Sequence, residues 1–535
     1  MKKMMTNMKT LVALLMAGAA VTSCSSDNEM DSPKAPAAKT YTMTVQATKG
    51  GDAMTRALAD GGTTLTATWS VDDVVEVWSE DGTTTKYGDL TAATAGASTT
   101  LTGTLTTAPT DQETLTLKYL SPSYATQDGT LTGTDNSIDK KCDYATATVT
   151  ATVSGTNVTT DAATFQHQQA IVKFTLKKSD GTALPSNPTA FTMTDGTSTV
   201  ELTNIPAGTY TTNGEGVLYV ALPAVSSKTV TLTATVGSDT YILTTSSAKS
   251  FANGSYYRVT AKMAKVVAYS SEIIVPAGDH WYIGGSSEYN NITIGNGATV
   301  TIGSFLQVQN ASIICSGNAT IILADETFTN ITGGRIQAGP EGTTLTIKGN
   351  TGELNINPGT SSGAAIGASD DACGNIVIEG GIITATGAQD AGIGASNAKC
   401  GNITISGGTV TVTGSNGAGI GASNAECGDI TISGGTVTAT GGTMAAGIGG
   451  GSSDNGWCGN ITISGGTVTA TGGFMSAGIG TGSENGCGDI TITSGVTHVT
   501  ATKGSGASAS IGAANDGDAQ CGEVNIEDES KVTQN

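Results

Sequence analysis

The sequence predicts an all-β chain, with an antiparallel β-sandwich region over residues 41–262 and a right-handed parallel β-helix over residues 266–535. Two observations predict this order. Short runs of period-two alternation fill the first region, and a Cys-Gly motif returns at near-regular spacing in the second. Glycine supplies 74 of the 535 residues, and no stretch of residues 41–262 sustains the 3.6-residue apolar period of a helix.

Residues 1–23 have the pattern of a secretory signal peptide. Three lysines precede an apolar run over residues 11–20, which is too short to be a membrane span. The tetrad ending in Ser23 and Cys24 resembles a bacterial lipobox, which implies cleavage between these two residues and a lipid on Cys24. We therefore expect a membrane lipid anchor. The alternative is a fully secreted chain in which Cys24 is incidental.

Residues 24–40 are polar and rich in proline and alanine, so they predict a disordered tether. The acidic residues Asp27, Glu29 and Asp31 resemble the surface-export signals of lipoproteins in Gram-negative anaerobes. This resemblance implies a location in the outer membrane that faces the exterior. An ordinary solvated linker is the other interpretation.

Residues 41–262 read as half-buried strands. The clearest runs cover residues 41–47, 65–69, 74–78, 115–119 and 170–176, and Gly, Asp, Asn and Pro separate them. This pattern predicts an antiparallel sandwich type of domain.

Four features of this region together resemble the fimbrillin family. They are Thr55-Arg56-Ala57, the segment 69–77 (Trp-Ser-Val-Asp-Asp-Val-Val-Glu-Val), the segment 165–170 (Phe-Gln-His-Gln-Gln-Ala) and the segment 252–257 (Ala-Asn-Gly-Ser-Tyr-Tyr). The resemblance implies two transthyretin-like sandwich subdomains, at about 41–163 and 164–262, in a surface lipoprotein of fimbriae. It also implies that cleavage after an arginine removes the first strand, so that a neighbouring subunit can fill the groove.

Arg56 follows the first expected strand and is the position that would serve as such a cleavage site. The alternative is an exposed loop residue in an uncleaved anchor or tip subunit. The large C-terminal region also departs from a simple stalk subunit, which would donate a strand from its tail.

The strongest signal is the repeat that starts at Cys400, Cys427 and Cys458, with looser copies from Cys373, Cys487 and Cys521. Each repeat predicts three strands with glycine corners, and repeats are regular from about residue 364. A single repeat cannot bury its apolar face, whereas stacked coils can. In one coil we expect six side chains to point inward: Ile403, Ile405, Val410, Val412, Ala418 and Ile420. This repeat is similar to β-helix repeats of adhesin-like or carbohydrate-binding-like bacterial surface proteins.

The cysteine column has one member per coil, so it lacks the close spacing of zinc motifs. We expect these cysteines to be small buried residues at the corners of the coils, stacked on one another as a ladder. Disulfides between neighbouring coils after export are the alternative, and sequence alone does not give their geometry.

Charge narrows the classes of ligand. The formal net charge is −21, which excludes nucleic acid as an electrostatic partner. Residues 266–535 hold 22 Asp and Glu against 5 Lys and Arg, so an acidic polysaccharide would need bridging calcium. Asp370, Asp371 and Asp390 are the candidate calcium ligands, and the same residues are the candidate carboxylates of a polysaccharide lyase or glycoside hydrolase. A solvated surface loop is the simpler interpretation of the pair Asp370 and Asp371.

Exposed aromatics are the usual contacts for neutral glycans. Trp457 and Phe474 fall at expected loop positions, and Trp281 lies near the domain junction. The alternative is that each of these aromatic side chains shields a hydrophobic end of the fold from solvent. The sequence therefore predicts a surface lipoprotein, fimbria-associated or adhesin-like and without catalytic residues, whose β-helix binds carbohydrate or mediates cell adhesion. The alternatives are an enzyme on the β-helix and a structural fimbrial subunit that assembles with other subunits.

Overall fold

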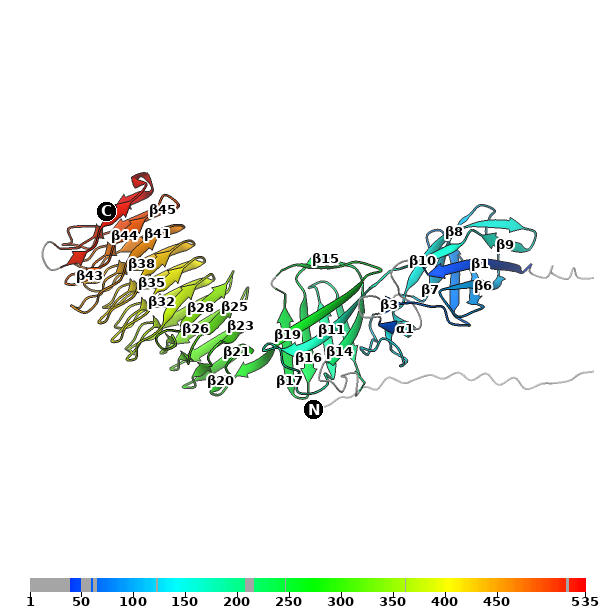
Figure 1. Ribbon diagram of the computed structural model, residues 1–535, viewed down its shortest axis with the longest axis horizontal. Helices are drawn as coiled ribbons and strands as arrows, with labels where there is room; N and C mark the ends of the chain where they lie inside the picture. The colour runs from blue at the N-terminus through cyan, green and yellow to red at the C-terminus, as the bar shows by residue number, and fades with distance from the viewer. Residues whose placement is uncertain are drawn as a thin grey trace, which may run out of the picture.

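The structure, a computed structural model, describes residues 39–49, 59–60, 65–121, 124–206, 216–245, 247–360, 362–515 and 519–535. The signal peptide, Ser23, Cys24 and Arg56 lie outside the described residues. Three units follow one another in a row: a first β domain, a second β domain and a β-helix that ends at the C-terminus (Figure 1). Among the described residues, no helix is long and apolar enough to cross a membrane.

The first β domain is a ring of hydrogen-bonded strands. Strand pairing runs β1–β6–β5–β4–β7–β8, and the ring closes because β9 and β10 both pair with β1 as well as with β8. Trp69 lies at its centre, with Tyr119 and Phe165 edge-on against it. The elements are β1 (Tyr41–Lys49), β2 (Ala59–Asp60), β3 (Leu65–Thr66), β4 (Val74–Ser79), β5 (Lys86–Ala92), β6 (Ser98–Leu105), β7 (Thr114–Tyr119), α1 (Ile138–Lys141), β8 (Ala145–Ser154), β9 (Asn157–Thr160) and β10 (Ala163–His167).

The boundary between the two β domains differs from the expected division at residues 163 and 164. β10 begins at Ala163 and completes the first ring, so the first domain extends to His167. The period-two pattern continues without a break across this point, which is why the sequence did not mark the boundary. A small cluster that includes Leu65, Ile138, Ile171 and Ala221 joins the two domains.

The second β domain is built around one long strand, β19. Pairing runs β14–β11–β19 on one side and β19–β17–β16–β12–β13 on the other, so both sheets share β19. The strands are β11 (Ala170–Lys178), β12 (Ala190–Thr194), β13 (Thr199–Thr203), β14 (Gly216–Leu222), β15 (Val225–Lys228), β16 (Thr231–Val236), β17 (Asp239–Thr244), β18 (Lys249–Phe251) and β19 (Tyr256–Tyr269).

β19 continues into the β-helix without a linker. Its first half pairs with β11, and its last residues, Lys265 to Tyr269, pair in parallel with Trp281 to Gly285 of β21 (His280–Glu288). Residues 263–265, which lie between the two predicted regions, are therefore the middle of one strand.

The β-helix has three parallel faces, which we name A, B and C in chain order within a regular coil. Face A holds the first part of β21 and of β23 (Ala298–Gln309), then β25 (Ala319–Leu323), β28 (Thr344–Gly349), β31 (Asn375–Ile378), β34 (Ile403–Ile405), β37 (Ile430–Ile432), β40 (Ile461–Ile463), β44 (Ile490–Ile492) and β48 (Val524–Ile526). Face B holds the rest of β21 and β23, then β26 (Phe328–Thr332), β29 (Glu353–Asn357), β32 (Ile382–Thr386), β35 (Thr409–Thr413), β38 (Thr436–Thr440), β41 (Thr467–Thr471), β45 (His498–Thr502) and β49 (Val532–Gln534).

Face C holds β20 (Ile273–Val275), β22 (Ile292–Ile294), β24 (Ile313–Cys315), β27 (Ile336–Gln337), β30 (Ile366–Gly367), β33 (Ile393–Gly394), β36 (Ile420–Gly421), β39 (Ile448–Gly449), β42 (Ile479–Gly480) and β46 (Ile511–Gly512). The cysteine column forms the corner from face C to face A, with β43 (Gly486–Cys487) and β47 (Gln520–Cys521) at its end. A 3-10 turn, η1 (Glu529–Lys531), precedes β49.

The coil register confirms the predicted β-helix and its inward side chains. Isoleucines of face A stand opposite isoleucines of the next coil, as in Ile403↔Ile430↔Ile461. All six residues expected to point inward from one coil are at most 1% exposed, while Thr409, Thr411 and Thr413 are exposed. The less regular coils of residues 273–360 stack in the same three faces.

Glycines of face C carry a constraint that the sequence did not reveal. Gly421 has φ of 133°, and a Cβ built on it would lie 2.2 Å from the carbonyl oxygen of Gly449 in the next coil. Gly394, Gly449 and Gly480 repeat this geometry. Glycine is therefore required within these short strands as well as at the corners.

We predict that Gly421→Ala destabilises the protein by about 1–3 kcal/mol or more, because alanine at this φ is strained and its methyl group meets a backbone oxygen. The midpoint of urea unfolding measures the change. Thr411→Ala, on the exposed side of β35, is the matched control and should change the midpoint little. Equal midpoints for the two variants would contradict the stacking constraint.

Candidate functional site at the junction of the second β domain and the β-helix

A row of three side chains crosses the junction sheet. Tyr241 of β17 stands opposite Lys265 of β19, and Lys265 stands opposite Trp281 of β21. Residues directly opposite one another in a sheet project from the same face. The continuity of β19 therefore places an indole, an ammonium and a phenol side by side, although 40 residues separate the outer two in the chain.

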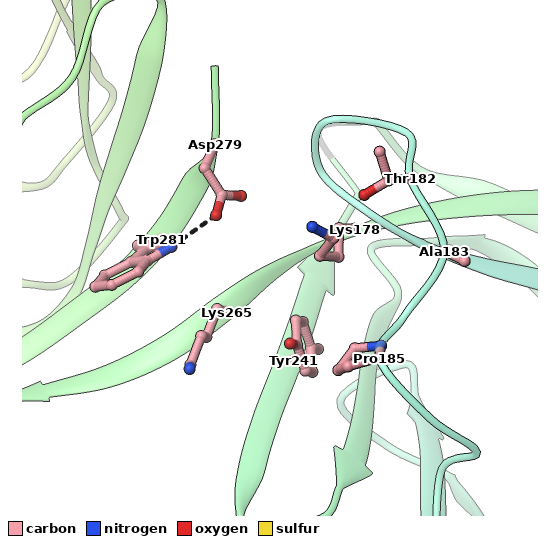
Figure 2. A pocket seen from close by; sticks show the side chains of 8 residues that line it. All are labelled: Lys178, Thr182, Ala183, Pro185, Tyr241, Lys265, Asp279 and Trp281. Carbon is pink, nitrogen blue, oxygen red and sulfur yellow. Dashed lines mark hydrogen bonds between the residues drawn. The ribbon is translucent and has the colours of Figure 1, made fainter. Parts of the chain in front are cut away.

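These side chains line a pocket of about 360 Å³, which we call the junction pocket. The other wall is formed by Lys178 at the end of β11 and by Thr182, Ala183 and Pro185 of the segment that follows, as Figure 2 shows. This volume falls at the lower end of the range of small-molecule sites in proteins.

Asp279 fixes both the indole and the wall of the junction pocket. One carboxylate oxygen accepts from Trp281 Nε1 at 2.9 Å (Figure 2). The other accepts from Ser179 Oγ at 2.9 Å and from the backbone N–H of His280 at 2.8 Å. Ser179 belongs to the second β domain and Asp279 to the β-helix, so the same carboxylate joins the two units and orients Trp281.

The two lysines of the pocket are each paired with a carboxylate. Lys265 Nζ lies 2.9 Å from Asp239, and Lys178 Nζ lies 3.4 Å from Asp180. Lys265 Nζ also stands 5.8 Å from the centre of the Trp281 ring, within the range of a cation–π contact. The lining therefore combines two ammonium groups with one carboxylate, that of Asp279, and the ion pairs with Asp239 and Asp180 leave no excess positive charge.

The opposite face of the same sheet carries a second groove of about 660 Å³. Neighbours of the first row line it, because successive residues of a strand point to opposite faces. Ile242, Ala264, His280 and Tyr282 contribute from β17, β19 and β21, and Asp325 and Asn350 contribute from later coils. His280 Nε2 lies 2.7 Å from Thr301 Oγ1, and burial lowers the pKa of this imidazole below its ordinary value of 6.5.

The structure places the three predicted calcium ligands in two different segments of the coil. Asp390 is buried in the segment between faces B and C, where its carboxylate accepts from Gly363 N at 2.7 Å and from Ser423 Oγ at 3.0 Å. Asp370 and Asp371 are exposed between face C and the cysteine corner. In the described part of the chain, no group of three or more His, Cys, Asp or Glu residues lies close enough to hold a metal ion.

The two predicted glycan contacts lie at different corners of the β-helix. Trp457 precedes the cysteine corner and covers Gly486 of the next coil, where a Cβ would lie 2.3 Å from the indole ring. Phe474 lies between faces B and C and is 53% exposed. They do not form one surface.

The sequence marked Trp281 as an aromatic near the junction but did not mark its partners. Lys178, Tyr241 and Lys265 lie in ordinary strand patterns, and only the register of β17, β19 and β21 brings them together. One signal in the sequence could have indicated the site. In the tripeptide Asp279-His280-Trp281, a carboxylate stands two residues before an indole.

Part of the β-helix matches a described family. Residues 376–397, 403–424, 430–452 and 461–483 match the family described as Beta helix repeat. These four segments are β-helix repeats. The matched segments cover faces A, B and C of successive coils and stop short of the junction pocket. No curated protein matches the chain.

Among solved structures, the chain is similar to a candidate cell adhesion protein from Bacteroides uniformis, with 16% identity over 42% of this chain and 95% of the other, at a TM-score of 0.25. It is similar to one from Bacteroides fragilis, with 10% identity over 41% and 92%, at a TM-score of 0.26. The shaft pilin SpaA from Lactobacillus rhamnosus matches with 11% identity over 42% and 98%, at a TM-score of 0.19. At these TM-scores the likeness carries no inference about function.

We predict that the stability of the protein falls as the pH drops from about 7 to 5, and that His280→Gln removes part of this loss. When the pH falls below 6.5, the imidazole of His280 binds a proton in the unfolded chain. In the folded protein, burial lowers the pKa of this imidazole, so it binds the proton only at a lower pH. The unfolded state is therefore favoured by acid. Urea unfolding of both proteins across this pH range measures the difference, and identical pH dependence would show that His280 contributes nothing.

Proposed function

We propose that this protein is a lipid-anchored surface protein of adhesin type that binds a neutral glycan in the junction pocket. The observation that carries the proposal is the row Tyr241–Lys265–Trp281, in which Asp279 holds the indole in place. The two β domains would lie near the anchor at Cys24, and the β-helix would extend outward from the cell. Outer-membrane location and export rest on the signal-peptide and lipobox patterns.

The chemistry of the pocket favours a sugar. An aromatic ring offers its face to the C–H side of a pyranose, and the tip of Lys265 beside the ring can donate to hydroxyl oxygens. Because Asp279 is already held by three donors, it orients the site and does not contact the glycan directly.

The charge of the pocket favours a neutral glycan over an acidic one. Both ammonium groups have carboxylate partners within 3.4 Å, so a uronate would displace an existing pair and would meet the negative β-helix. Calcium-bridged binding of an acidic polysaccharide through Asp370 or Asp371 stays an alternative, and so does an enzyme on the β-helix. Hydrogen bonds to Gly363 and Ser423 occupy Asp390, which favours a structural role for this carboxylate.

We predict that Trp281→Ala weakens glycan binding about tenfold or more, because the ring supplies the main apolar contact. Affinity electrophoresis of the full chain through a glucan, a mannan, a xylan and polygalacturonate measures binding. Trp78→Ala is the matched control, since Trp78 Nε1 also donates to a carboxylate, Glu76, at 2.9 Å, and Lys118 lies 4.9 Å from its ring centre in the first β domain.

Three results would count against this proposal. Equal retardation of both variants would place the binding surface elsewhere. Retardation by polygalacturonate alone, lost on addition of a chelator, would favour the calcium alternative. Shortening of any polysaccharide would favour the enzyme, and loss of that activity in Asp370→Asn or Asp371→Asn would assign it to the β-helix.

A structural fimbrial subunit is the second candidate function, and the position of β1 favours it. β1 is the first described strand and pairs with β6 along eight residues, as well as with β9 and β10. Cleavage after Arg56 would separate β1 from the rest of the chain and open the ring along β6. The groove left behind would accept a strand from another subunit.

We predict that an arginine-specific protease removes the N-terminal segment through Arg56 and that Arg56→Ala prevents this. The other two arginines lie in or beside paired strands, Arg258 in β19 and Arg335 before β27, so Arg258→Ala is the control that should not alter cleavage. Mass spectrometry of the product and filament assembly measure the outcome. An uncleaved wild-type chain that remains monomeric would count against the subunit function.

We also predict that Cys24→Ala abolishes incorporation of labelled palmitate and releases the protein from the outer-membrane fraction. The reason is that the thiol of Cys24 is the expected site of lipid attachment. Persistence of the protein in the membrane fraction without label would contradict the lipid anchor.

A further inference from the structure

Six cysteines form a continuous ladder along one corner of the β-helix. Cys373, Cys400, Cys427, Cys458 and Cys487 are joined in register by parallel bridges, and Cys487 pairs with Cys521 in the two-stranded sheet β43–β47. Neighbouring strands lie about 4.8 Å apart, which is within the Cα separation that a disulfide spans. No packing reason requires a thiol here, since alanine would also fit a small buried corner.

Two pairs of sulfur atoms make short contacts, and the thiol of Cys400 also has a side-chain hydrogen bond with Cys427. Cys373 Sγ lies 3.1 Å from Cys400 Sγ, and Cys487 Sγ lies 2.8 Å from Cys521 Sγ. These contacts lie at the two ends of the ladder. Once the end pairs are assigned, the two middle members, Cys427 and Cys458, face each other across one bridge.

We propose that the ladder oxidises to three disulfides, Cys373–Cys400, Cys427–Cys458 and Cys487–Cys521, each of which joins two successive coils. Only this pairing uses all six thiols. The shifted pairing, Cys400–Cys427 and Cys458–Cys487, leaves both end cysteines reduced and separates the two pairs of sulfurs that are in contact.

The oxidant is a small-molecule disulfide or a thiol oxidase of the compartment outside the cytoplasm. For each pair, a cysteine thiolate attacks the oxidant disulfide and expels one thiolate, which gives a mixed disulfide. The second cysteine, after losing its proton, attacks the first sulfur and expels the other thiolate. One Sγ–Sγ bond forms, one oxidant disulfide becomes two thiols, and two electrons are transferred.

The C-terminal pair is the most accessible entry for this reaction. Cys521 is partly exposed, whereas the other five members are at most 5% exposed. The hydrogen bond with Cys487 lowers the pKa of the Cys521 thiol, which favours its attacking thiolate form. The other two pairs, Cys373–Cys400 and Cys427–Cys458, close while the coils are still stacking, before burial excludes the oxidant.

The test is peptide mapping of the full chain after refolding with reduced and oxidised glutathione and alkylation of the remaining thiols. Cleavage at Glu and Asp separates every neighbouring pair of the ladder, because Glu379, Glu426, Asp454, Glu484 and Asp489 lie between successive members. We expect the three proposed linkages, with Cys24, Cys142 and Cys315 outside any disulfide. A fully alkylated ladder or the shifted pairing would overturn the proposal.

Two cysteine variants test the pairing itself, whatever fraction of the protein refolds and oxidises. Cys487→Ser should leave Cys521 alkylated and the other two linkages intact, while Cys315→Ser, outside the ladder, should retain all three. Reduction of the oxidised protein should lower its thermal midpoint by about 5 °C or more, because each linkage closes a loop of about 30 residues. No shift on reduction would count against the linkages.

Oxidation in the cell rests on the proposed export, whereas the pairing does not. Protein isolated from cells and alkylated at once should show the same three linkages. If the linkages form on refolding but are missing from the cellular protein, the proposed export would be contradicted, while the proposed pairing would still stand.

Discussion

The structure depends on the in-register stacking of parallel coils. Each coil must present a side chain of similar size at the same position as the coil before it, because the neighbour along the stack is less than 5 Å away. This constraint explains the isoleucine columns of faces A and C, the glycines of face C and the single cysteine at each corner. The stack begins on β19, which already belongs to the second β domain, so the same constraint fixes the junction between these two units.

Features that depend on local sequence patterns could be predicted from the sequence, whereas contacts between residues far apart in the chain could not. From about residue 364 the repeat is close to identical from coil to coil, so its strands, inward residues and cysteine corner could be predicted. Residues 266–365 lack that regularity, so the sequence predicted that they belong to the β-helix but did not give the positions of their coils. The junction could not be predicted, because Tyr241, Lys265 and Trp281 meet through strand register, a property that no local pattern encodes. The sequence also did not show that Asp390 lies between faces B and C, whereas Asp370 and Asp371 lie between face C and the cysteine corner.

The location of the junction pocket gives the three units distinct roles. The first β domain carries β1, the strand that Arg56 would release, and the β-helix carries most of the negative charge. Between them, the sheet of β17, β19 and β21 carries Lys265 and the ordered indole of Trp281 on one face and His280 on the other. For the proposed glycan, a pocket preformed by this continuous sheet would reduce the entropy lost on binding.

β19 joins the second β domain and the β-helix into one continuous body, and hydrogen exchange of the backbone amides of residues 256–285 would detect any break in it. We expect residues 264–269 to exchange as slowly as the central coils, since they pair with β17 and β21. Rapid exchange confined to residues 264–269, with slow exchange on both sides, would show a hinge at the junction and would rule out a continuous body.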